Sequence, residues 1–195
     1  NDKFYFNIFH INENFLNNIL ACISVLSKLN LNLNKIENIF KNFTVPDGRG
    51  DIKIVKNFKK SFKFIDESYN ANPLSMYSSI KNMNSLKKKK GNKKIVLLGD
   101  MLELGNKSKK LHKDLSSIIN KSDIDQVFVY DKSIKETYNS LLIKKRGKIF
   151  KTLYDAYNHL SKIINNNDLL MIKGSNATGL NKFSKSIKKG NNIVI

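Results

Sequence analysis

The sequence predicts an α/β protein with a Rossmann-like, mostly parallel sheet and helices on both faces. After residue 50, apolar runs of strand length alternate with segments whose apolar residues recur at helical spacing. Parallel strands need such long crossover connections, so the alternation favours a parallel sheet. With 195 residues, 41% of them hydrophobic, the chain has enough material for one large core and a smaller second unit.

Two helical patterns precede this alternation, at about residues 13–29 and 34–43. The apolar face of the first consists of Phe15, Ile19, Cys22, Ile23 and Leu26. We therefore expect the Cys22 thiol to lie in a core. The chain begins at Asn1 within a strand-like alternation over residues 4–9, so we also expect it to be part of a longer protein.

The segment Pro46-Asp47-Gly48 interrupts the helical pattern and predicts a boundary between domains 1–47 and 48–195. The predicted strands of the second domain are 52–56, 62–66, 94–98, 126–130, 148–151 and 168–172. Its predicted helices are 74–86, 108–120, 133–143, 153–165 and 177–188.

The formal charge of +19 raises a nucleic-acid-binding alternative, because clustered cations displace counterions from phosphates. Nearly all the cations are Lys, and Arg49 and Arg146 are the only two Arg residues. The charge is spread along a chain that is also rich in Asn and Ile, which favours compositional drift over a dedicated surface. We therefore expect no nucleic-acid partner.

Other composition signals indicate a protein of the cytoplasm. A single cysteine excludes an internal disulfide framework, and no segment has the length and apolarity of a membrane span or signal peptide. The histidines His10, His112 and His159 lack the spacing of metal ligands, so we expect no metal site within the chain. The sequence leaves the oligomeric state open, with a monomer as the simplest expectation.

Four polar segments follow predicted strands, at 66–72, 99–105, 130–133 and 173–176. In an open α/β sheet, ligands bind outside the carboxyl ends of the strands. We therefore expect all four segments to lie along one edge and to form a binding site.

The segment IDESYNANPLSM, residues 65–76, combines several features of a nucleotide site. Asn72 can cap a helix that begins at Pro73, and free amides at a helix N-terminus favour anions. Asp66 can accept hydrogen bonds from ribose hydroxyls, while Tyr69 and Asn70 offer a stacking face and an amide. The alternative is a local helix cap beside a packed tyrosine.

Arg49 lies between Gly48 and Gly50 in a turn at the predicted boundary. Its planar fork of donors suits a phosphate. The alternative is a solvated turn residue.

These motifs together resemble the C-terminal part of a Mur ligase, over essentially the whole chain. The matching stretches are GRG, IDESYNANPLSM, LLGDMLELG followed by Ser108 and His112, and MIKGSNATGL. The resemblance is most specific to the branch of the family that uses D-alanyl-D-alanine. It implies that residues 1–47 are the helical tail of a central ATPase domain and that residues 48–195 are the C-terminal ligase domain.

The resemblance also implies an activity and its partners. Mur ligases use ATP and Mg2+ to phosphorylate a terminal carboxylate, here that of UDP-N-acetylmuramoyl-tripeptide, and the amine of D-alanyl-D-alanine then attacks the acyl phosphate. The product is a cytoplasmic peptidoglycan precursor. A related Mur ligase or a folylpolyglutamate synthase with another acceptor remains the alternative.

By motif matching, the resemblance assigns roles to individual residues. Asn18 contacts adenine, Arg49 the phosphates and Asp66 the ribose, while the rest of the nucleotide cleft comprises Tyr69, Asn70 and Asn72. A weaker transfer assigns dipeptide or tripeptide contacts to Asp100, Glu103, Lys173 and Ser175. For Glu103 and for His112, a structural role remains an equal alternative.

The chain also departs from the family pattern. Asn14 stands where the family has a His, and we expect His10, which has the same spacing to Asn14, to be structural. The sequence contains no G-x-x-x-x-G-K-[ST] phosphate loop. Gly174 and Gly179 have the spacing of its two glycines, but Leu180-Asn181 follows them where the loop requires Lys and then Ser or Thr. We therefore expect the catalytic Lys and the Mg2+ ligand to lie upstream, no catalytic residue within the chain, and no ATP turnover by the chain alone.

Overall fold

The computed structural model describes residues 3–7, 13–41 and 45–190, with side chains described from residue 16 in the first helix. It divides into two compact units, Asn1–Val45 and Pro46–Ile195.

The first unit contains helix α1 (Glu13–Lys28) and the short 3-10 helix η1 (Leu33–Ile36). The helix predicted at 13–29 is thus present. The second predicted helix is reduced to η1, which Asn32 caps by accepting a hydrogen bond from the Asn34 amide at 3.1 Å. Residues 3–7 form no strand, so the predicted alternation there is wrong where the structure describes it.

The expectation that Cys22 lies in a core is also wrong, because its side chain is exposed. Among the described side chains of this unit, only Ile19 and Leu33 are buried. A unit of this size has too few elements to cover a whole helix face. His10 and the side chains of Asn14 and Phe15 lie outside the described residues.

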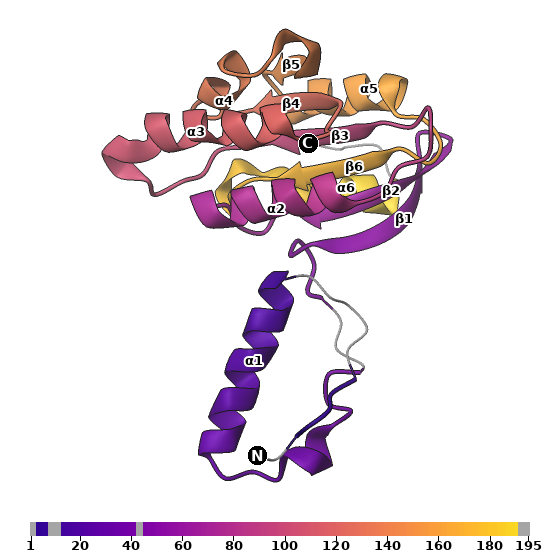
Figure 1. The fold of residues 1–195 in the computed structure, drawn as a ribbon. Coiled ribbons are helices and arrows are strands. Elements are labelled where there is room, and N and C mark those ends of the chain that lie inside the picture. The colour runs from indigo at the N-terminus through magenta and orange to yellow at the C-terminus, as the bar shows by residue number, and fades with distance from the viewer. Residues whose placement is uncertain (1–2, 8–12, 42–44, 191–195) are drawn as a thin grey trace. The chain divides into compact units, whose positions relative to one another are not determined.

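The second unit is built on a six-stranded sheet with the order β1-β2-β6-β3-β4-β5 (Figure 1). β1 pairs antiparallel with β2, and every other neighbouring pair is parallel, which confirms the predicted mostly parallel sheet. The strands are β1 (Asp51–Asn57), β2 (Lys60–Glu67), β3 (Lys94–Leu98), β4 (Gln126–Tyr130), β5 (Arg146–Phe150) and β6 (Leu169–Lys173).

Within the described residues of this unit, five α-helices and three 3-10 helices lie between these strands or follow the last of them. The α-helices are α2 (Pro73–Ser85), α3 (Ser108–Lys121), α4 (Lys135–Asn139), α5 (Leu153–Ile163) and α6 (Leu180–Lys189); the 3-10 helices are η2 (Gly105–Lys107), η3 (Ile143–Lys145) and η4 (Asn176–Thr178). The helix predicted at 133–143 is much shorter than expected. The helix predicted at 177–188 is divided, because Gly179 adopts a left-handed conformation with φ of 82° between η4 and α6.

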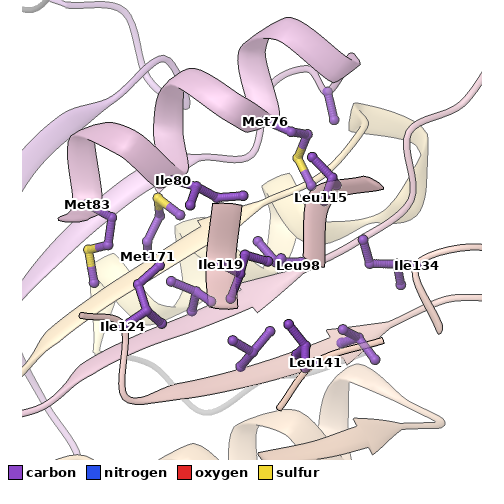
Figure 2. Packing of buried hydrophobic residues seen from close by; sticks show 14 of the residues in the cluster. Met76, Ile80, Met83, Leu98, Leu115, Ile119, Ile124, Ile134, Leu141 and Met171 are labelled. Carbon is purple, nitrogen blue, oxygen red and sulfur yellow. The ribbon is translucent and has the colours of Figure 1, made fainter. Parts of the chain in front are cut away.

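Both faces of the sheet carry an apolar core. Figure 2 shows the first, in which Met76, Ile80 and Met83 of α2 pack with Leu115 and Ile119 of α3 over the sheet. On the other face, α5 and α6 pack over the sheet through the buried residues Ala156, Leu160, Leu180, Phe183 and Ile187. All five residues of β3 and all five of β6 are buried, as expected for central strands covered on both faces.

No helix in the described part of the chain has both the length and the apolarity to cross a lipid bilayer.

Candidate functional site

The carboxyl ends of β2, β6, β3 and β4 meet at one edge of the sheet, because these strands are parallel neighbours. The loops after β2, β3 and β6 enclose a groove of about 790 Å³ at this edge. Four of the predicted site residues line it: Asn70, Asn72, Glu103 and Ser175. The sequence thus correctly anticipated that these separate segments assemble.

Asn72 forms the cap of α2, as the sequence predicted. Its Oδ1 accepts the Ser75 amide hydrogen at 2.8 Å, and the Ser75 hydroxyl accepts the Asn72 amide hydrogen at 3.0 Å. Pro73 occupies the first turn, where its missing N–H costs no hydrogen bond. The neighbouring Asn70 is exposed and its Oδ1 accepts the Ala71 amide hydrogen at 2.8 Å, which fixes the loop at the groove.

Lys173 and Ser175 connect the loops beneath the groove. The Lys173 ammonium is buried, donates to the Asn70 carbonyl at 3.1 Å and lies 3.5 Å from Glu67 Oε2. Burial lowers the pKa of Lys173, and the charge of Glu67 partly opposes that shift. The Ser175 hydroxyl accepts the Leu102 amide hydrogen at 3.0 Å. Substrate contact by Lys173 and Ser175 stays a prediction.

Asp100 is buried and anchors the loop that leads into α4. Its two carboxylate oxygens accept the backbone amides of Ser133 and Ile134, at 3.0 and 2.7 Å. The helix predicted from residue 133 begins at Lys135, directly after these two anchored amides. A contact between Asp100 and a substrate stays a prediction.

His112 is fully buried in a polar network of its own. Its Nε2 accepts the Met101 amide hydrogen at 2.9 Å, and its Nδ1 lies 2.8 Å from the Ser108 carbonyl oxygen, which requires the proton on Nδ1. The geometry therefore fits the structural alternative for His112. Glu103 differs, because it is exposed in the groove and has a positive φ of 63°.

We predict that Asp100→Asn destabilises the second unit by about 1–3 kcal/mol. The substituted amide can accept only one of the two backbone hydrogen bonds, and its NH2 group then faces the other amide donor. The measurement is the midpoint of chemical unfolding of Asp100→Asn. The control is Asp114→Asn, a substitution at an exposed position of α3, which should unfold at a higher midpoint than Asp100→Asn. Equal midpoints for the two variants would remove the anchoring role of Asp100.

Arg49 lies in a second part of the edge, on the loop before β1. Its guanidinium carbon lies 4.3 Å from the centre of the Tyr69 ring, so the cation stacks on the aromatic face. Gly48 and Gly50 have φ values of 78° and 95°, which L side chains rarely adopt. The Gly48 carbonyl accepts the Tyr69 amide hydrogen at 3.1 Å, and the Asp66 carbonyl accepts that of Gly50 at 2.7 Å.

Asp66 is buried at the end of β2 and is already paired. Its Oδ1 accepts the Ser68 hydroxyl hydrogen at 2.6 Å, and its Oδ2 lies 2.8 Å from the Lys188 ammonium. The ribose role of Asp66 stays a prediction. Sequence reasoning missed Lys188, since nothing in the sequence distinguishes it from the many other lysines of the chain.

Asn18, the predicted adenine contact, is exposed on α1 of the first unit. Its role, like those of Arg49 and Tyr69, stays a prediction. Within the described residues, no group of three or more His, Cys, Asp or Glu side chains could hold a metal ion.

A mostly parallel α/β sheet with a groove outside its strand ends defines the Rossmann-like class of ligand-binding domains. The sequence model of the family described as "Mur ligase, glutamate ligase domain" matches residues 52–176, which include five of the six strands in full and part of the remaining one, β1. The chain belongs to the Mur ligase family.

Two curated relatives carry the same name, UDP-N-acetylmuramoyl-tripeptide--D-alanyl-D-alanine ligase. The Rickettsia prowazekii protein is 28% identical over 172 residues, which cover 88% of this chain and 37% of the relative. The Bacillus subtilis protein is 32% identical over 126 residues, which cover 63% of this chain and 27% of the relative. The chain thus spans well under half the length of these relatives.

The fold agrees with a solved structure of the family. The Thermotoga maritima MurF ligase in complex with ADP has a TM-score of 0.75 at 21% identity, over 93% of this chain and 39% of that one. This likeness supports the fold.

Proposed function

We propose that this chain provides the C-terminal domain of a cytoplasmic, ATP-dependent ligase that joins D-alanyl-D-alanine to UDP-N-acetylmuramoyl-tripeptide. The observation that carries the proposal is the groove at the carboxyl edge of the sheet, lined by Asn70, Asn72, Glu103 and Ser175, in a chain of the Mur ligase family. The curated relatives named for this reaction support the choice of substrates. The product is a peptidoglycan precursor.

The proposal divides the edge between two ligands. The loop with Arg49 and the end of β2 with Asp66 and Tyr69 face the nucleotide, and Asn18 of the first unit contacts its adenine. Asn70 and Asn72 line the nucleotide side of the groove. Its other side, with Glu103 and Ser175 on the wall, receives the peptide substrates, and Lys173 is buried next to Asn70. Residues 1–47 belong to the central ATP-binding domain in this proposal, and residues 48–195 form the domain that completes the site.

The reaction needs no catalytic side chain from these residues. ATP phosphorylates the terminal carboxylate of the tripeptide, and the dipeptide amine displaces phosphate from the acyl phosphate to form the amide. The contribution of this chain is to bind and orient the two peptides and the nucleotide. Mg2+ is proposed to bind outside the described residues, and the working enzyme is proposed to be a monomer.

An acceptor comparison tests the proposal. The native gene product that contains these 195 residues is incubated with ATP, Mg2+ and UDP-N-acetylmuramoyl-tripeptide, and ADP release is followed with D-alanyl-D-alanine, D-alanine or L-glutamate. We expect ADP release with D-alanyl-D-alanine and none with D-alanine or L-glutamate. Release with another acceptor and not with the dipeptide would contradict the choice of D-alanyl-D-alanine and favour a relative that uses another acceptor.

A further inference from the structure

Lys188 joins three carboxylates that come from different parts of the second unit. Its ammonium lies 2.8 Å from Asp66 Oδ2, 3.0 Å from Asp47 Oδ1 and 3.9 Å from Asp51 Oδ2. The Lys188 side chain is only 12% exposed, so solvent screens these interactions less than at an open surface. Burial lowers the pKa of Lys188, but the hydrogen bonds with Asp66 and Asp47 and the negative charges of Asp66 and Asp51 together raise that pKa above its usual value.

The three carboxylates surround the loop that carries Arg49. Asp47 precedes Gly48, and Asp51 follows Gly50 and accepts the Gly48 amide hydrogen at 3.3 Å. The backbone carbonyl of Asp66 accepts the Gly50 amide hydrogen. The Lys188 ammonium therefore faces Asp47 and Asp51 on the two sides of the loop. It also faces Asp66, at the end of the strand against which the loop packs.

Without Lys188, these carboxylates would have one remaining cationic partner in the part of the chain that the structure describes. Lys53 lies 3.1 Å from Asp51 and 3.5 Å from Asp47, but its side chain is 54% exposed, and no ion pair joins it to Asp66 within the described residues. The negative charge of Asp66 would then lie buried beside Asp51 with no cation bound to it. Asp51 and Asp66 are paired across β1 and β2, and like charges on paired strand residues repel one another, so the repulsion would displace the loop.

We infer that Lys188 is a positioning residue for nucleotide binding: it holds the carboxylate of Asp66 and the Arg49 loop in the arrangement that receives the nucleotide. This inference rests on the proposed function, since it assigns Arg49 and Asp66 to the nucleotide. Lys188 acts through these two residues: it pairs with Asp66 directly, and with Asp47 and Asp51 on the two sides of the Arg49 loop.

Helix α6 is also held in place independently of Lys188. Leu180, Phe183 and Ile187 are buried in the core, and the Asn57 side chain donates to the Ile187 carbonyl at 2.9 Å. Loss of the Lys188 ammonium should therefore move the loop more than the helix. This difference separates a positioning role from a purely structural one.

The test compares the Michaelis constants of the native gene product and its variants for ATP and for D-alanyl-D-alanine. We expect Lys188→Met to raise the KM for ATP roughly tenfold, to change the KM for the dipeptide less than about twofold, and to be restored in large part by Lys188→Arg. Lys185→Met, at an exposed position of the same helix, is the control and should leave both constants unchanged. Equal changes in both constants, or no change, would overturn the inference.

If Lys188→Met does not fold, a second variant tests the positioning role of Lys188. Asp47→Asn removes one anionic partner of Lys188 from a side chain that is 63% exposed, so it should fold. We expect a roughly threefold rise in the KM for ATP alone, and an unchanged value would overturn the inference. Failure of the native protein to release ADP would contradict the proposed function instead, so the two failures are distinguishable.

Discussion

Arg49→Lys in the native gene product should lower kcat/KM for ATP by roughly ten- to a hundredfold. The guanidinium offers a planar fork of donors and stacks on the Tyr69 ring at 4.3 Å. A lysine ammonium keeps the charge but cannot bond a phosphate through two parallel N–H groups, and it loses much of the stacking. Steady-state kinetics with ATP as the varied substrate provide the measurement.

Arg146→Lys is the matched control for this prediction, because Arg146 is the only other arginine. Its guanidinium donates to the carbonyls of Leu141 at 3.0 Å and Asn139 at 2.7 Å, away from the proposed nucleotide site. This control should lose some stability and retain its kcat/KM for ATP. An Arg49→Lys variant with native kinetics would remove Arg49 from phosphate binding.

Gly48→Ala should both destabilise the second unit and weaken the use of ATP. An alanine at a φ of 78° is strained by about 1–2 kcal/mol, and its Cβ would lie 3.0 Å from the backbone nitrogen and the Cβ of Tyr69. The loop must therefore shift away from Tyr69, which separates Arg49 from its stacking partner. The measurements are the unfolding midpoint and the KM for ATP.

Gly91→Ala is the control that shows the effect of backbone strain without a contact like that between residue 48 and Tyr69. Gly91 has a similar φ of 88°, but a Cβ there would meet nothing within 4 Å. Its substitution should cost about 1 kcal/mol of stability through strain alone and should leave the KM for ATP unchanged. If Gly48→Ala behaves in the same way as Gly91→Ala, the contact between the loop and Tyr69 does not matter for the nucleotide.

Much of the fold could be predicted because its signals are local. The central strands β3 and β6 are continuous apolar runs, and Asn72-Pro73 marks a helix start in the sequence itself. The assembly of the groove followed from one rule of parallel sheets, since loops after neighbouring strands must share an edge.

The contacts that shape the site could not be predicted, because they join residues distant in sequence. Lys188 reaches Asp66 across more than 100 residues, and Lys173 pairs with Glu67 over a similar separation. Asp100 likewise anchors residues 133 and 134 across more than 30 residues of sequence. The prediction that Cys22 lies in a core was wrong for a different reason. Its helix is present, but the small unit around the helix leaves the Cys22 thiol exposed.

The most direct test of the proposed ligase activity is the identification of its product. The native gene product is incubated with ATP, Mg2+, UDP-N-acetylmuramoyl-tripeptide and D-alanyl-D-alanine, and the nucleotide products are resolved by mass spectrometry. We predict a UDP-N-acetylmuramoyl-pentapeptide that forms in step with ADP and only when both substrates are present. ADP release without a pentapeptide, or no release at all, would contradict the proposal.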